Sequence, residues 1–168
     1  MSISLYDTAF NTFRSGLRAM DSILAKAEAH AKARGYEPAN LLHARIAPDM
    51  FDLTRQVQIA CDMAKSGAAR LAGVEVPSHP DTETTYDELH ARIAKVLAFL
   101  DTLDRKAIDG AAGRDIVVPL RDRKLEFKGS DYLVGWALPN FYFHVTTTYA
   151  ILRHNGVELG KKDFLGGN

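Results

Sequence analysis

The sequence has one cysteine, Cys61, and no excess of charge of either sign. A single cysteine cannot form an intramolecular disulfide, and the N-terminal segment lacks the basic and apolar stretches of a signal peptide, so we predict a cytoplasmic protein. The 21 Lys and Arg residues balance the 21 Asp and Glu residues. The chain therefore has no net field that would attract nucleic acid or an anionic membrane surface, and neither is predicted as a partner.

Several familiar signals of function are also missing from the sequence. No window approaches the roughly 18 to 20 continuous apolar residues that a membrane helix needs. There is no Gly-rich phosphate loop, no HExxH, no Gly-x-Ser-x-Gly and no paired-cysteine zinc motif. The 168 residues are 46% apolar and 25% charged. These values are typical of a globular protein, and they predict one domain over residues 1–168.

Three segments show the apolar periodicity of amphipathic helices. The first covers residues 4–34 and is followed by Gly35, which suits a helix end. The second covers residues 50–71, with Pro48 placed for its first turn. The third begins with Thr85 and Glu88, the two members of a capping box, and is expected to end near residue 104.

The pattern changes after the third helix. Apolar residues alternate with other residues between Asp115 and Lys128, which predicts a short β-hairpin. A fourth helix is predicted from Ser130, as its N-cap, to about Asn155. Four helices of this kind bury their apolar faces together only in a bundle, so the predicted fold class is all-α, a four-helix bundle with a hairpin between helices three and four.

The fourth helix carries polar side chains on its apolar stripe. Pro139 removes a backbone hydrogen bond and predicts an irregularity near residues 135–139. Asn140 and His144 follow on one face, with Thr148 one turn further on. Two interpretations remain open: His144 is a buried histidine bonded to a neighbouring group, or it binds a ligand or takes part in catalysis.

Helix two offers one residue that could reach His144. Gln56 flanks the apolar stripe and is the better placed of two glutamines, although a glutamine at the edge of a stripe is often only solvated. Cys61 flanks the other side of the stripe, and a packed side chain is the simpler interpretation. The other histidines have no metal-ligand spacing and are predicted to be surface residues.

Three parts of the sequence resemble an uncharacterised family of unknown function that is grouped with the DinB/YfiT-like metalloenzymes. They are Ser4-Leu-Tyr-Asp7, the pair Ala47-Pro-Asp-Met-Phe51 and Arg55-Gln-Val-Gln-Ile-Ala60, and the pair Leu138-Pro-Asn-Phe-Tyr-Phe-His144 and Leu152-Arg-His-Asn-Gly156. The resemblance implies a four-helix bundle in which one histidine of the second helix and a His-x-x-x-His pair of the last helix hold a divalent metal. It also implies kinship with thiol-cofactor-dependent transferases and isomerases.

The resemblance places His144 at the second histidine of the pair, Asn140 at the first and Gln56 at the histidine of helix two. Only one of the three expected histidines is kept. Amide oxygens are much poorer ligands than imidazole for zinc or nickel, so a degenerate metal site without a firmly bound metal is expected.

Three hypotheses of function follow. In the first, a bundle pocket binds a small molecule through Asn140, His144, Gln56 and Thr148, within an apolar cleft that contains Phe141, Trp136 and Tyr149. In the second, the chain is a divalent-metal-dependent transferase or hydrolase with a thiol cofactor, whose site His144 completes with a carboxylate such as Asp49 or Asp62. In the third, it is a non-catalytic dimeric structural module. A homodimer is expected under all three.

Overall fold

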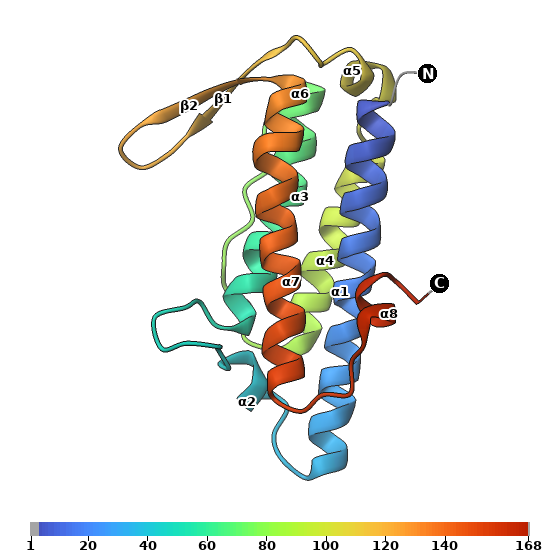
Figure 1. Cartoon of the computed structure of the whole chain (residues 1–168), viewed down its shortest axis with the longest axis vertical. Helices are drawn as coiled ribbons and strands as arrows, with labels where there is room; N and C mark the ends of the chain where they lie inside the picture. The colour runs from blue at the N-terminus through green and yellow to red at the C-terminus, as the bar shows by residue number, and fades with distance from the viewer. Residues whose placement is uncertain (1–3, 168) are drawn as a thin grey trace.

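The computed structural model describes residues 4–167 and is mainly helical. Its long helices are α1 (Leu5–Arg34), α3 (Leu53–Ala72), α4 (Tyr86–Asp101) and α7 (Leu138–His154), which lie side by side as a bundle (Figure 1). The shorter helical elements are α2 (Ala39–Leu42), α5 (Arg105–Asp109), α6 (Gly129–Tyr132), the π-helical turn η1 (Leu133–Ala137) and α8 (Lys161–Phe164). Strands β1 (Asp115–Pro119) and β2 (Lys124–Lys128) form the only sheet of residues 4–167. The predicted all-α bundle with a hairpin between its third and fourth long helices is confirmed.

Local signals determine both ends of α1. The Ser4 hydroxyl accepts a hydrogen bond from the Asp7 amide at 3.0 Å, which satisfies one of the free N–H groups of the first turn. Gly35 follows the helix with a φ of 75°, and its amide reaches back to the last carbonyls. The predicted helix over residues 4–34 is therefore confirmed almost to the residue.

Helix α3 begins later than its apolar pattern predicts. Residues 47–50 form a turn closed by a hydrogen bond from the Met50 amide to the Ala47 carbonyl, so Pro48 is not in the first turn of the helix. The helix starts only after Asp52, whose carboxylate accepts from the Arg55 amide. An N-cap side chain is a stronger start signal than one more apolar residue at helical spacing.

The predicted capping box of α4 is present, with Thr85 and Glu88 bonding to each other's backbone amides. The helix ends at Asp101, before the predicted end near residue 104. Asp104 instead caps α5, where its carboxylate accepts from the amides of Lys106 and Ala107. Helices α2, α5 and α8 were not predicted, because one helical turn is too short to show a period.

The hairpin pairs Asp115 with Lys128 and Pro119 with Lys124 in an antiparallel register. Ile116 and Val118 point into the bundle core, whereas Val117 is exposed, which is the alternation that the sequence predicted. Figure 1 shows the strands extending away from the end of the bundle where α6 begins.

The fourth helical segment starts at Gly129 rather than after Ser130. Ser130 lies inside α6 and makes no cap hydrogen bond, so its predicted role as N-cap is wrong. A Cβ atom on Gly129 would come within 2.0 Å of the Ala111 carbonyl oxygen, so only glycine allows the chain to enter the helix here. The irregularity predicted at residues 135–139 is the π-helical turn η1, followed by Pro139 in the first turn of α7.

Helices α1 and α7 pack closely against each other in the bundle core. The Phe141 ring is fully buried and meets the Phe13 ring edge-on, with the ring centroids 5.1 Å apart. A Cβ atom on Gly16 would lie 2.6 Å from the Phe141 ring, so the glycine makes room for it. None of the helices among residues 4–167 has the length and the apolar composition of a membrane-spanning segment.

Candidate functional site

Gln56 and His144 meet between α3 and α7. The Nδ1 atom of His144 lies 2.7 Å from Oε1 of Gln56, and Gln56 is only 1% exposed. The two residues are far apart in the sequence but belong to two helices that pack closely together. The expectation that Gln56 reaches His144 across the bundle is therefore met in the structure.

The contact determines which nitrogen of His144 carries the proton. The Gln56 amide donates through Nε2 to the Phe51 carbonyl at 3.2 Å, which leaves Oε1 facing the histidine. A carboxamide oxygen can only accept, so the imidazole must be protonated on Nδ1. The Nε2 atom then keeps its lone pair, because the only hydrogen bond of the ring to residues 4–167 is made by Nδ1.

The surroundings of His144 also keep the ring neutral. Burial is the larger cause and the nearby positive charge of Arg55 the smaller, and together they lower the pKa of His144 to about 4. At neutral pH the side chain is therefore uncharged. It presents one hydrogen-bond acceptor, Nε2, on a half-buried ring.

Asn140 and Thr148 do not use their side chains on His144. The Asn140 amide donates to the Trp136 carbonyl at 2.8 Å, one turn back on its own helix. The Thr148 hydroxyl donates to the backbone carbonyl of His144 at 2.9 Å, so it supports the helix rather than the ring. Of the predicted polar set, the structure joins only Gln56 to the His144 ring.

The three aromatic residues expected to share a cleft face different neighbours. Trp136 lies 5.9 Å from the ring of Phe127 in the hairpin, whereas Phe141 is in the bundle core. Tyr149 lies 6.1 Å from the ring of Phe164 in α8. They extend in separate directions from one continuous helical segment, so they do not form a common wall around His144.

Two exposed phenylalanines lie next to the pair instead, and the sequence reasoning missed them. Phe51 and Phe143 are each 57% exposed. The Phe143 ring is 5.2 Å from the imidazole, edge to face, and the Phe51 ring is 5.9 Å from the guanidinium carbon of Arg55. Their positions in the sequence could have indicated them, because Phe143 immediately precedes His144 and Phe51 lies just before α3.

The residues at this site do not fit a transition metal. The Oε1 atom of Gln56 is engaged by the protonated Nδ1 of His144, and Asn140 donates to its own helix. No group of three or more His, Cys, Asp or Glu side chains within residues 4–167 is arranged to hold a metal ion. Asp62, one of the two carboxylates considered as a further ligand, is paired with Lys65 and Arg92, and the other, Asp49, is exposed.

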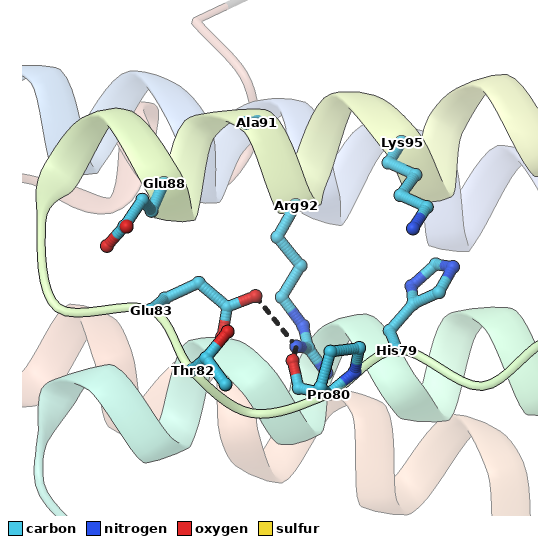
Figure 2. Close-up of a pocket in the computed structure, with 8 residues that line it drawn as sticks. All are labelled: His79, Pro80, Thr82, Glu83, Glu88, Ala91, Arg92 and Lys95. Carbon is cyan, nitrogen blue, oxygen red and sulfur yellow. Dashed lines mark hydrogen bonds and ion pairs between the residues drawn. The ribbon is translucent and has the colours of Figure 1, made fainter.

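A second polar cluster surrounds Arg92 on α4, which is 3% exposed. Its guanidinium donates to Asp62 of α3 and to three acceptors of the connection between α3 and α4 (Figure 2 draws Arg92, Pro80 and Glu83). Those three are the Pro80 carbonyl, Asp81 and Glu83. Arg55 extends the cluster through Asp81 and Gln58. The cluster holds the connection against both helices.

A cavity of about 250 Å³ opens beside Arg92, between α4 and the connection (Figure 2). His79 and Lys95 point toward each other on one side of it. His79 is half-buried, as are His30 and His90, so of the four histidines predicted at the surface only His43 is exposed. The two carboxylates in the wall are already bonded, Glu83 to Arg92 and Gln58, and Glu88 to the start of its own helix. The geometry assigns this cluster a structural role.

Comparison with known proteins fits this picture. A family model described as "Domain of unknown function (DUF1993)" matches residues 5–165. The chain belongs to the DUF1993 family. No match was found among curated proteins. Among solved structures, this DUF1993 chain is similar to a DinB family member protein from Shewanella denitrificans, with 46% identity and a TM-score of 0.90 over 96% of this chain and 92% of the other. The resemblance inferred from the sequence is confirmed.

Proposed function

We propose that this DUF1993 chain binds a small molecule at the Gln56–His144 pair. The supporting observation is the free Nε2 lone pair of a histidine that Gln56 holds in one tautomer. A donor group of the ligand bonds to Nε2, and its apolar part lies against Phe51 and Phe143. A few fixed polar groups beside apolar surface are typical of ligand sites.

The positive charge near the site limits which net charge the ligand can carry. Arg55 is close enough to lower the pKa of His144 although it is paired with Asp81, so a cationic group at Nε2 would also meet some repulsion. A neutral imidazole nitrogen accepts from a hydroxyl or a thiol. The ligand we propose therefore carries a hydroxyl or thiol and is neutral or acidic, rather than an amine.

The alternative of a metal-dependent transferase would need His144 to direct a free nitrogen at a metal together with other strong ligands. Gln56 and Asn140 do not provide them, so the proposal does not depend on a metal.

A cytoplasmic location remains a prediction from the sequence.

Thermal unfolding in the presence of single compounds tests the proposal. A panel of small thiols, hydroxy acids and amines is added to the wild type, to His144→Phe and to His154→Phe. His154 is an exposed histidine at the end of the same helix and serves as the matched control. A compound that binds the folded state raises Tm, by mass action.

We expect at least one thiol or hydroxy acid to raise Tm in the wild type and in His154→Phe but not in His144→Phe. If no compound of these classes stabilises the wild type, or if the shift persists in His144→Phe, the proposed site is wrong.

A further inference from the structure

The outward side of α7 is unusual for a helix at the surface of a bundle. Between Asp131 and Arg153 the sequence has no Asp, Glu, Lys or Arg. Several of these residues are nevertheless exposed. We call five of them the α7 face: Gly135 of η1, and Pro139, Tyr142, Phe143 and Thr146 of α7. Tyr142 is 44% exposed and Phe143 57%, so large apolar side chains stand in a stretch without charge.

The other long helices that flank the bundle have the usual polar exteriors. Exposed positions of α1 include Arg18 and Lys26, and exposed positions of α4 include Asp87 and Lys95. An amphipathic helix normally places charged residues opposite its buried stripe. The α7 face departs from this pattern along most of its length, which is typical of a surface that is covered in the functional protein.

We propose that the α7 face binds the α7 face of a second copy of this chain. A two-fold dimer brings each surface patch against the same patch of its partner, so a charge close to the axis meets its own copy. A face without charge avoids this repulsion. Gly135 is exposed and has no side chain, so it leaves room for a second backbone to approach.

The area of the face indicates which neighbours take part. The segment Leu133–His154 is about 33 Å long at about 1.5 Å per residue, and one helix is about 10 Å wide, which gives a strip of roughly 330 Å². A stable interface needs about 800 Å² per partner. Adjacent apolar residues must contribute, and Phe51 and Ile46 are 57% and 45% exposed in the connection before α3. Figure 1 shows this connection and the hairpin projecting on the same side of α7.

Such a dimer also affects the proposed ligand site. Phe143 and Phe51 lie beside the Gln56–His144 pair, so a second copy seated on the α7 face would cover the open side of the site. Only this consequence rests on the proposed function. The pairing itself follows from the charge pattern and the exposure of α7.

Light scattering after gel filtration measures the mass directly, with Tyr142→Glu as the test variant and Val74→Glu as the control. Val74 is 46% exposed but lies in the connection after α3, away from α7. We expect the wild type and Val74→Glu to have twice the chain mass of 18.5 kDa, and Tyr142→Glu to have the mass of one chain with an unchanged circular dichroism spectrum. A monomeric wild type at tens of micromolar would overturn the proposal.

A cysteine variant gives an independent test if Tyr142→Glu fails to fold. Cys61 is fully buried, so an introduced cysteine is the only accessible thiol among the described residues. Under mild oxidation we expect Tyr142→Cys to form a disulfide-linked dimer, and the exposed α1 variant Ser22→Cys to remain a single chain. Equal, slow cross-linking of both variants would contradict the proposal.

The outcomes for dimer and ligand are separable. A monomeric Tyr142→Glu that still gains Tm with a ligand through His144 would support both claims. A dimeric wild type that no thiol or hydroxy acid stabilises would refute the ligand proposal alone. A monomeric wild type that sediments with lipid vesicles, where Tyr142→Glu does not, would overturn the dimer and assign the face to a membrane surface.

Discussion

At the scale of single residues, Gln56 determines the chemistry of His144. Its amide oxygen lies 2.7 Å from Nδ1 of the histidine ring. The ring is held neutral, with Nδ1 protonated and Nε2 free. The most informative substitution is therefore one that keeps the size of Gln56 and changes its charge.

Replacing Gln56 by Glu places a carboxylate against Nδ1 of His144. A negative charge within hydrogen-bond distance favours the imidazolium, so we expect the pKa of His144 to rise well above its present value of about 4. An NMR titration of the histidine ring protons measures the change. Gln58→Glu, on the same helix and bonded to Arg55 instead, is the control and should move this pKa much less.

The low pKa of His144 also makes stability depend on pH. The unfolded chain protonates this histidine near its ordinary pKa of 6.5, while the folded chain resists protonation down to about pH 4. The unfolded state therefore binds more protons in this range, and the free energy of unfolding falls as pH drops from about 6.5 to 4. Urea unfolding across this range should show a smaller fall for His144→Phe, and the wild-type slope for His154→Phe. Identical slopes in all three proteins would contradict the account.

At the scale of elements, the Arg92 cluster connects two helices to the chain between them. Removing this buried cation leaves Glu83 without an ion-pair partner, while Asp62 keeps Lys65 and Asp81 keeps Arg55. Breaking a buried ion pair costs about 3–5 kcal/mol. We expect Arg92→Ala to lower the free energy of unfolding by roughly that amount in urea unfolding. Lys95→Ala, an exposed position on the same helix, should change it by less than about 0.5 kcal/mol.

Acid should weaken the same cluster. Burial alone would raise the pKa of Glu83, but the hydrogen bonds from Arg92 and Gln58 outweigh it and leave the pKa below the ordinary value of 4.5. A depressed carboxyl pKa contributes stability that is complete above about pH 4.5 and is lost as pH falls further. Thermal unfolding below pH 4.5 should therefore show a smaller further decrease in Glu83→Gln than in the wild type. An equal decrease would mean that Glu83 is not paired in solution.

The elements also show what the sequence can and cannot predict. The four long helices and the hairpin were predictable because each carries a clear period or a cap, as with Thr85 and Glu88. The start of α3 was not, because Met50, two residues before the N-cap Asp52, also fits the apolar pattern of the helix. The position of Gln56 beside the stripe pointed to His144, but its hydrogen bond to Phe51 depends on a connection whose path no periodicity describes. The same holds for Arg92, whose partners lie mostly in a connection.

At the scale of the whole molecule, the bundle packs α3 against α7 and so creates the place of the candidate site. Helices from distant parts of the chain bring Gln56 and His144 together, in a chain of the DUF1993 family that is similar to a DinB family member protein. The exposed side of α7 lies next to the same place. Ligand binding and pairing of two copies would therefore concern one region of the surface.

The most direct test is the tautomer of His144, observed by long-range proton–nitrogen NMR on ¹⁵N-labelled protein at pH 7 without added metal. The account predicts a neutral ring with its proton on Nδ1, and a signal at Nε2 that responds to the thiol or hydroxy acid that raises Tm. His144→Phe identifies the signal. A proton on Nε2, or a charged ring at this pH, would contradict the role assigned to Gln56 and the ligand site that depends on it.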